Sequence, residues 1–317
     1  MQQTIKIGTR GSVLALAQAN DVKAKLVAAH ADLTDESIEI VVIKTTGDII
    51  LDRHLMTAGG KGLFTKELED ALLSGDIDCA VHSSKDMPTS LPDGLALTAF
   101  LPREDVRDVF ISPRANNFMG MQEGATLGTA SLRRRALALR LRPDLNVVTF
   151  RGNVQTRLRK LNEGQAEATF LARAGLNRMG MEAEITETLS LDDFPPAPAQ
   201  GAVTVEIKDT NTHMQERLAP LHCLDTAAQV TAERAFLASL DGSCRTPIAA
   251  VASLSDDMVT LRALLLSLDG TTVFEETGTS DRDAGAALGD TLGQKIRAQA
   301  GPEFFETLKR EIEATIE

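Results

Sequence analysis

Strand-like and helix-like segments alternate through the first 200 residues, and this alternation constrains the fold more than any other feature of the chain. The β-branched run Ile38–Lys44 predicts a strand, and Val13–Ala29 predicts a helix for which Ser12 is a suitable N-cap. Such alternation is typical of parallel sheets with helices on both faces, so the sequence predicts α/β sheets in this region. The other strands expected here are Thr4–Gly8, Ile77–Val81, Leu95–Phe100, Val109–Ser112, Thr126–Gly128, Val147–Phe150, Ala168–Leu171 and Ala202–Ile207, and the other helices are Gly62–Leu73, Ser131–Leu141 and Val154–Leu161.

The C-terminal third of the chain follows a different pattern. A long helix is expected over residues 226–240, followed by two helices at the end of the chain, Arg282–Ala298 and Pro302–Ile316. Between them, three successive antiparallel strands are expected over Thr246–Leu254, Met258–Ser267 and Thr271–Gly278. A chain of 317 residues can hold two or three domains, and this segment is expected to form a small α+β domain of its own.

Basic residues are concentrated in one segment of an otherwise acidic chain. Residues 130–160 contain nine basic residues and one acidic residue, a net charge of +8, whereas the whole chain carries −12. Most of them are arginines, whose planar guanidinium binds carboxylates and phosphates in a bidentate manner. The segment therefore predicts a site for a small, multiply charged anion. Two alternatives remain open for five of these residues: they bind the anion, or they lie on an ordinary solvated helix face. The five are Arg135, Arg140, Arg142, Arg159 and Lys160.

Composition narrows the classes of partner. A sequence pI near 5.0 and the absence of Trp and Tyr argue against nucleic acid, which is bound by basic surfaces and aromatic stacking. No apolar run approaches the roughly 20 residues that a membrane helix needs, and the N-terminal segment lacks the pattern of a signal peptide. We therefore expect a cytoplasmic protein with no nucleic-acid or membrane partner.

The three cysteines are odd in number and widely spaced. This spacing predicts neither a disulfide framework nor a zinc site, and no metal is expected. Cys79, inside an apolar strand, and Cys223 are expected to be small buried hydrophobic residues.

Several short motifs follow one another along the chain. They begin with Arg10-Gly11-Ser12, Gly59-Gly60-Lys61-Gly62-Leu63-Phe64 and His82-Ser83-Ser84-Lys85-Asp86-Met87-Pro88. They continue with Gly128-Thr129-Ala130-Ser131-Leu132-Arg133-Arg134, Arg151-Gly152-Asn153-Val154-Gln155-Thr156-Arg157-Leu158, Ala232-Glu233-Arg234-Ala235-Phe236 and Gly242-Ser243-Cys244. In this order, the motifs resemble those of the porphobilinogen deaminase (hydroxymethylbilane synthase) family.

The resemblance implies a transferase of tetrapyrrole biosynthesis, which leads to haem, chlorophyll and corrins. Such an enzyme condenses four porphobilinogen molecules head to tail, loses ammonia at each step and releases the linear hydroxymethylbilane by hydrolysis. The family carries a dipyrromethane cofactor, made from its own substrate and attached to a cysteine through a thioether. The matching residue is Cys244, and its loop-like surroundings beside Arg245 favour a reactive thiolate.

The resemblance also implies roles for other residues. Asp86 matches the catalytic carboxylate, which would stabilise the cation left by the loss of ammonia and assist proton transfer. The residues expected to bind the cofactor are Ser83, Lys85, Thr129, Ser131, Arg133, Arg134 and Arg151. Those expected to bind the incoming substrate or the growing chain are Arg10, Ser12, Arg151, Arg157 and Arg178.

The resemblance further implies how the domains are arranged. Two doubly wound α/β domains, similar to the halves of periplasmic binding proteins, would surround a cleft in a monomeric enzyme. Residues 1–101 and 202–219 would form the first domain with Asp86, and residues 102–201 the second, with the arginine-rich face. Residues 220–317 would form the small α+β domain that carries Cys244, and a mobile loop of about residues 47–59 would lie over the site.

Three positions depart from the family pattern, and two other functions remain open. Ala199 stands where the family usually has glycine, which leaves the backbone path there open; Ala130 replaces a common hydroxyl residue, and Thr46 stands where many relatives have a basic residue.

A solute-binding or regulatory domain would give Cys244 no role. A cysteine hydrolase would leave the arginines unused and would need a partner for Cys244 among His30, His54, His82, His213 and His222.

Overall fold

A computed structural model describes residues 4–46, 65–240, 242 and 246–314. The chain divides into two compact units, residues 1–104 with 202–227 (unit 1) and residues 105–201 with 228–317 (unit 2). The expected mobile loop over residues 47–59 and the expected cofactor attachment site, Cys244, lie outside the described residues. The division into three domains stays a prediction.

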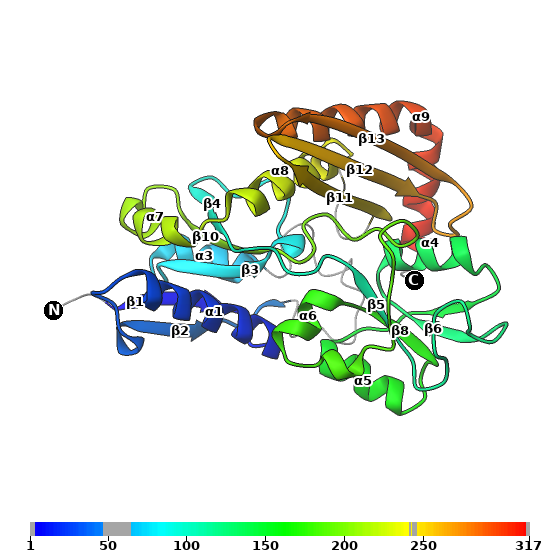
Figure 1. The fold of residues 1–317 in the computed structure, drawn as a ribbon, viewed down its shortest axis with the longest axis horizontal. Coiled ribbons are helices and arrows are strands. Elements are labelled where there is room, and N and C mark those ends of the chain that lie inside the picture. Colours follow the sequence, from blue (N-terminus) through cyan, green and yellow to red (C-terminus); the bar gives the residue numbers. More distant parts are fainter. Residues whose placement is uncertain (1–3, 47–64, 241, 243–245, 315–317) are drawn as a thin grey trace. The chain divides into compact units, whose positions relative to one another are not determined.

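Unit 1 is built on a five-stranded sheet with the order β2-β1-β3-β10-β4 (Figure 1). The strands are β1 (Ile5–Thr9), β2 (Ile38–Val42), β3 (Cys79–Ser83), β4 (Leu95–Phe100) and β10 (Val203–Lys208). β1 runs parallel to β2 and β3, whereas β10 runs antiparallel to β3 and β4. The expectation of parallel sheets is therefore wrong for β10, because the chain returns to this sheet from the opposite end after forming part of unit 2.

Helices cover both faces of this sheet. α1 (Val13–Ala29) begins at Ser12, whose Oγ accepts the backbone N–H of Ala15 at 3.2 Å, as expected of an N-cap. Its apolar face packs with Cys79 and Val81 of β3 in one core cluster, while the intervening Ala80 belongs to a second cluster with α3 (Lys66–Ser74). This alternation along β3 is the two-residue period of a strand buried on both faces. The other helical elements in the described residues of this unit include α7 (Thr212–Leu218) and the short 3-10 turns η1 (Asp35–Ser37), η2 (Ser84–Asp86) and η4 (Ala219–Leu221).

Unit 2 contains a second five-stranded sheet with the order β7-β6-β8-β5-β9. The strands are β5 (Asp108–Ile111), β6 (Thr126–Gly128), β7 (Asn146–Val148), β8 (Ala168–Ala172) and β9 (Glu187–Thr188). β6 is parallel to β7 and β8, but β5 is antiparallel to β8 and pairs with β9 on its other side. The expectation of a parallel sheet is therefore wrong for β5 as well, because the chain enters this sheet along β5 from the opposite end.

The helices of this second sheet also lie on opposite faces. α4 (Leu132–Leu141) packs with Phe110 and Phe170, whereas α5 (Val154–Asn162) and α6 (Arg173–Arg178) pack on the side of Val109 and Leu171. Neighbouring residues of β5 and β8 thus point to different helices. As a result, the N-terminal turn of α4 and the start of β5 lie close together, as the contacts described below show.

The C-terminal part of unit 2 is a three-stranded antiparallel sheet, β11 (Ile248–Ser255), β12 (Met258–Leu266) and β13 (Val273–Asp281), in that order (Figure 1). One face packs against α8 (Leu224–Ser239) and α9 (Gly285–Ala314), and Leu264 and Leu266 of the other face pack into the α4 cluster. Gly301, with φ 70°, interrupts α9 before Pro302, so the two expected helices are present as two segments. The predicted fold class, two α/β sheets and a small antiparallel sheet with helices, is confirmed.

Candidate functional site

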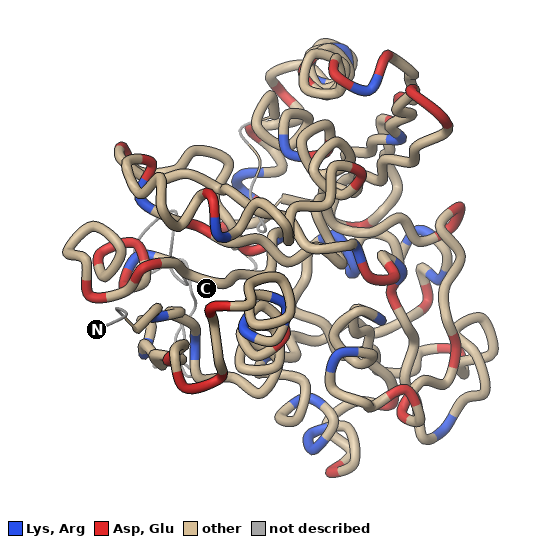
Figure 2. The backbone as a smooth tube through the Cα atoms, turned by 60° about the vertical axis from the view of Figure 1, so that its left-hand side comes forward, with Lys and Arg blue, Asp and Glu red and all other residues tan. Residues whose placement is uncertain are grey.

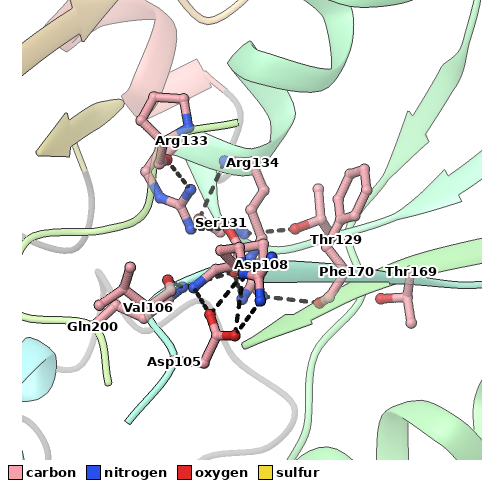
Figure 3. Close-up of polar contacts among 12 residues, drawn as sticks. Asp105, Val106, Asp108, Thr129, Ser131, Arg133, Arg134, Thr169, Phe170 and Gln200 are labelled. Carbon is pink, nitrogen blue, oxygen red and sulfur yellow. Dashed lines mark hydrogen bonds and ion pairs between the residues drawn. The ribbon is translucent and has the colours of Figure 1, made fainter. Parts of the chain in front are cut away.

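A buried carboxylate between two arginines is a central polar cluster of unit 2 (Figure 3). Asp108, the first residue of β5, accepts a 2.6 Å hydrogen bond from Nη2 of Arg133 and a 2.7 Å hydrogen bond from Nη2 of Arg134, each at a different oxygen. The Asp108 side chain is 0% exposed, and both arginines are buried. Burial would raise the pKa of Asp108, but the charges of Arg133 and Arg134 outweigh it and hold that pKa well below its ordinary range.

The N-terminal turn of α4 supplies both arginines. Ser131 is the N-cap: its Oγ accepts the backbone N–H of Arg134 at 3.4 Å, and its own N–H donates to Oγ1 of Thr129 at 3.2 Å. Consecutive side chains on a helix point about 100° apart. Arg133 and Arg134 nevertheless converge, because both guanidinium groups bind the carboxylate of Asp108. The structure thus brings four of the predicted cofactor-binding residues together at one helix end.

Both guanidinium groups have donors that the described residues do not satisfy. Nη1 of Arg133 donates to the Pro195 carbonyl at 2.7 Å, and Nη1 of Arg134 donates to the Phe170 carbonyl at 2.9 Å. The two Nε atoms are buried and have no partner in the described part of the chain. A buried donor without an acceptor costs about 1–3 kcal/mol, so an anion at this helix end would be stabilised by donors that are already in place.

Arg157, on α5, adds positive charge to the same cluster. Its Nε is buried and, within the described ranges, has no hydrogen-bond partner. Desolvation, reinforced by the charge of Arg134 and only partly offset by Asp108, lowers the pKa of Arg157 to about 10. Three arginines and one aspartate leave a net charge of +2 in a largely buried setting, which favours a negatively charged ligand.

Two further predicted arginines of unit 2 lie in different surroundings. Arg151 precedes α5, and its Nε is also buried without a partner among the residues that the structure describes. Arg178 ends α6, and its Nη2 donates to the Gly201 carbonyl at 2.7 Å. Arg151 therefore resembles Arg157 in having a buried donor, whereas one donor of Arg178 is bound to Gly201, which lies just before β10.

Several other basic residues of the 130–160 segment stabilise local structure. Arg142 binds Asp144 through Nε at 2.8 Å and Nη2 at 2.6 Å, and it also donates to the carbonyls of residues 119, 121 and 122. Arg159 forms an exposed pair with Glu163 at 2.7 Å, one helical turn away on α5. Arg140 is exposed. For these residues the alternative of an ordinary helix face or a local bridge fits better than an anion site.

The return segment before β10 adds an amide to the cluster. Nε2 of Gln200 donates to Oδ1 of Asp108 at 2.9 Å and to the Val106 carbonyl at 2.8 Å. The preceding Ala199 is buried with φ 62°, in the left-handed region that favours glycine, and its N–H donates to Glu233 at 2.6 Å. The alanine thus takes a backbone conformation that a glycine would adopt without strain, which answers the question left by the sequence.

In unit 1, Asp86 ends the short turn η2, directly after β3. It is exposed, and among the described residues no hydrogen bond or ion pair reaches its carboxylate. The turn around it is anchored, because the Ser84 N–H donates to the Ala202 carbonyl at 3.0 Å and Met87 is buried. An accessible carboxylate on a fixed turn suits a group that acts on a ligand.

The other predicted residues of unit 1 lie near the same edge of the sheet. β1 and β3 are parallel, so the segments that follow them, with Arg10 and Ser12 after β1 and Lys85 after β3, share the carboxyl edge where α/β sheets bind ligands. Ser83 and Gln18 of α1 exchange hydrogen bonds of 2.9 and 3.2 Å, which tie these two segments together. Lys and Arg are interspersed with Asp and Glu along the backbone of both units (Figure 2).

A second buried polar cluster, in unit 1, was not predicted. Nε2 of His82 lies 3.0 Å from Oε2 of Glu206, and both side chains are almost fully buried. Glu69 of α3 lies nearby: burial and the charge of Glu206 raise its pKa, although a hydrogen bond from Thr65 opposes the change. The signal that could have revealed this cluster is a charged or imidazole residue inside each of two apolar strands.

The cysteines differ from one another in burial. Cys79 is fully buried, and burial raises the pKa of its thiol, which confirms the expectation of a structural residue. Cys223 is partly exposed, so the expectation of burial is wrong, because this residue lies in the short connection between η4 and α8. Both are free thiols.

Comparison with protein families decides between the functions left open by the sequence. The family described as "Porphobilinogen deaminase, dipyromethane cofactor binding domain" matches residues 5–216, and "Porphobilinogen deaminase, C-terminal domain" matches residues 227–298. The chain belongs to the porphobilinogen deaminase family. The resemblance inferred from the motifs is confirmed, and the family's dipyrromethane-binding domain covers both the Asp86 turn and the arginine cluster.

Curated relatives of the porphobilinogen deaminase family agree along almost the whole chain. The porphobilinogen deaminase of Nitrobacter winogradskyi is 52% identical over 299 residues, which are 94% of each chain. The chloroplastic porphobilinogen deaminase of Oryza sativa subsp. japonica is 52% identical over 309 residues, 96% of this chain and 86% of that one. Among solved structures, the periplasmic VFT2 domain of Bordetella pertussis BvgS matches 68% of this chain and 86% of that one at 17% identity, with a TM-score of 0.39.

The residues present fit the cofactor of the porphobilinogen deaminase family. Dipyrromethane carries acetate and propionate groups, and the buried Nε atoms of Arg133, Arg134, Arg151 and Arg157 are donors that need acceptors. A carboxylate satisfies such donors with strong, charge-assisted hydrogen bonds. The sequence analysis predicted no role for Asp108 or Gln200, although these two residues hold the cluster together.

Proposed function

We propose that the arginine cluster of unit 2 and Asp86 of unit 1 carry out the activity of the porphobilinogen deaminase family in this chain. That activity is the head-to-tail polymerisation of porphobilinogen by a transferase of tetrapyrrole biosynthesis that holds a dipyrromethane cofactor. The observation that carries the proposal is the excess of buried positive charge at the start of α4, where Arg133, Arg134 and Arg157 outnumber Asp108. Ligands with two carboxylates on each ring supply the anions that this cluster lacks.

The binding residues divide between the cofactor and the substrate. In the proposal, the N-terminal turn of α4 binds side-chain carboxylates of the cofactor, because its guanidinium donors are buried and partly unsatisfied. The cofactor-binding residues are Ser83, Lys85, Thr129, Ser131, Arg133, Arg134 and Arg151. The residues that bind the incoming porphobilinogen or the growing chain are Arg10, Ser12, Arg151, Arg157 and Arg178.

Asp86 is the proposed catalytic carboxylate. Its exposure leaves both oxygens accessible to a substrate, and its anchored turn keeps the charge in one place. A fixed anion stabilises the positive charge that develops on a pyrrole when ammonia leaves. The same oxygens can accept a pyrrole N–H and take part in the proton transfers that accompany ring joining.

Cys244 is the proposed attachment site of the cofactor, through a thioether. When bound, the cofactor supplies the primer to which the substrate units are joined. The support for this assignment is the motif Gly242-Ser243-Cys244 within a chain that belongs to the family.

The intact mass of the denatured protein tests the attachment. Wild-type protein and a Cys223→Ser control should both show a mass excess of two linked pyrrole units, because Cys223 is a partly exposed thiol outside the proposed site. Cys244→Ser should have the bare-chain mass. A mass excess on Cys244→Ser, or no excess on wild type after incubation with porphobilinogen, would contradict the assignment.

We also propose a monomeric, cytoplasmic enzyme of three domains, with residues 1–101 and 202–219, 102–201 and 220–317. The support for the domains is that each contains one of the three sheets, with β10 in residues 202–219 completing the sheet of the first domain. Nowhere in the described part of the chain does a helix reach the length and apolar character needed to cross a membrane. Sedimentation of the purified protein tests the monomer, and a dimer mass would contradict it.

A further inference from the structure

We propose that Asp108 is a positioning residue for the reaction. Its carboxylate orients the guanidinium groups of Arg133 and Arg134 so that their remaining donors are presented to the carboxylates of the cofactor. The inference rests on the proposed function, and it adds a residue that lies outside the motifs of the sequence.

The Asp108 carboxylate is itself held rigidly. Oδ2 accepts Nη2 of Arg133 at 2.6 Å, and Oδ1 accepts both Nη2 of Arg134 at 2.7 Å and Nε2 of Gln200 at 2.9 Å (Figure 3). Its backbone is part of β5, where its carbonyl accepts the N–H of Leu189 at 3.0 Å. Because both the backbone and the carboxylate are fixed, Asp108 can transmit a defined orientation to its partners.

Each arginine is then fixed at two points. Besides Asp108, Arg133 binds the Pro195 carbonyl and Arg134 binds the Phe170 carbonyl, in each case through Nη1. Two bonds at the two Nη atoms define the plane of a guanidinium. They also leave the Nε–H buried and without a partner among the described residues. A guanidinium carries five N–H donors, so donors held in a fixed plane remain beyond these bonds for a ligand carboxylate.

A purely structural role for Asp108 is the alternative. Without its charge, Arg133, Arg134 and Arg157 would form a buried cluster of three positive charges, and stability alone could explain an aspartate here. The two roles predict different kinetics. A structural residue changes the amount of folded enzyme, whereas a positioning residue changes the turnover of each folded molecule that carries the cofactor.

The chain offers a matched control three residues away. Asp105 is also an aspartate between two arginines, with 2.6 Å to Nη2 of Arg107 and 3.4 Å to Nε of Arg173. Its side chain is 18% exposed and lies outside the residues proposed to bind a ligand. These ion pairs of Asp105 involve Arg107 and Arg173 rather than Arg133 and Arg134, so replacing Asp105 is a control for the loss of an aspartate–arginine pair in the same segment.

The experiment compares Asp108→Glu, Asp108→Asn and Asp105→Asn as full-length enzymes loaded with cofactor. Turnover and KM for porphobilinogen are measured well below the thermal midpoint and expressed per cofactor-bearing molecule, counted by intact mass. Asp108→Glu keeps the charge but moves it by one methylene, so we expect kcat to fall by about 100-fold, as for a 1 Å misplacement, with KM little changed. Asp105→Asn should keep the wild-type kcat.

Two results would overturn the inference. The first is wild-type kcat per loaded molecule in Asp108→Glu, with only a lower thermal midpoint; this variant also decides the matter if Asp108→Asn does not fold. The second concerns Arg134→Gln: because Asp108 then orients Arg133 alone, Asp108→Asn should cause a smaller loss of turnover in that background than in wild type, and full additivity of the two losses would mean that Asp108 does not act through Arg134. Wild-type turnover of Arg134→Gln alone would instead contradict the proposed role of Arg134 in binding the cofactor.

Discussion

Replacing Arg157 by methionine should stabilise the cofactor-free protein while it abolishes turnover. The reason is that Arg157 is a poorly compensated cation in a largely buried position beside Arg134. Its folded-state pKa is lowered, so the charged form opposes folding at every pH below that value. The penalty is fully present at neutral pH and decreases only as the pH rises through about 10.

The size of the effect follows from the pKa. Each pKa unit corresponds to about 1.4 kcal/mol, and lowering the pKa of Arg157 to about 10 therefore corresponds to about 3 kcal/mol. Since the side chain is partly exposed, solvent reduces this value, and methionine keeps most of the apolar contact of the arginine stem. We expect the variant to be more stable by about 1–3 kcal/mol, a rise of a few degrees in Tm.

Thermal unfolding of cofactor-free wild type, Arg157→Met and Arg159→Met provides the assay. Arg159 lies on the same helix but is exposed and paired with Glu163, so its replacement should leave Tm unchanged or slightly lower. The reasoning is refuted if Arg157→Met unfolds at a lower temperature than wild type. It is also refuted if the control gains as much stability as Arg157→Met.

Three further predictions concern other parts of the chain. Asp86→Asn should lose nearly all turnover while stability changes by less than about 0.5 kcal/mol, because the side chain is exposed; an Asp93→Asn control should keep activity, and normal product formation by Asp86→Asn would remove this residue from the mechanism. Ala199→Gly should be neutral or more stable by up to about 1 kcal/mol in urea unfolding, since relief of the left-handed alanine outweighs the added chain entropy; a clear loss would contradict this. Glu69 has a raised pKa, so its ionisation opposes folding as the pH rises above the ordinary pKa of glutamate; the stability of Glu69→Gln relative to wild type should therefore increase as the pH rises from below that ordinary value, and a difference that does not change with pH would speak against it.

Much of the fold could be predicted because the relevant signals are local. The N-cap Ser12, the strands of apolar residues and the glycine-proline break at Gly301 depend on residues close in sequence. The direction of β5 and β10 could not be predicted in this way. Both strands lie where the chain passes between the two units, and their direction depends on the end at which the chain enters each sheet.

The candidate site was predicted where motif and local structure coincide. Thr129, Ser131, Arg133 and Arg134 occupy one strand-to-helix turn, so their proximity follows from the sequence. Asp108 escaped prediction because it is one of several acidic residues in the segment 104–108, and only the pairing of β5 with β8 places it beneath α4. The burial of both arginines also has no sequence signal, since clustered arginines are usually exposed.

Burial of the arginine cluster favours binding of an anionic ligand but lowers the stability of the protein without that ligand. Binding a ligand with many carboxylates away from water makes each hydrogen bond stronger, but the same exclusion of water destabilises guanidinium groups that have no ligand. Asp108 reduces the charge of the cluster from +3 to +2, and two carbonyl acceptors satisfy one donor of each buried arginine. The remaining excess charge and the buried Nε atoms are left for an anion, so the cofactor would complete the hydrogen bonding that the chain leaves incomplete. Stability and activity are therefore expected to change in opposite directions when Arg157 loses its charge, but in the same direction when Asp108 does.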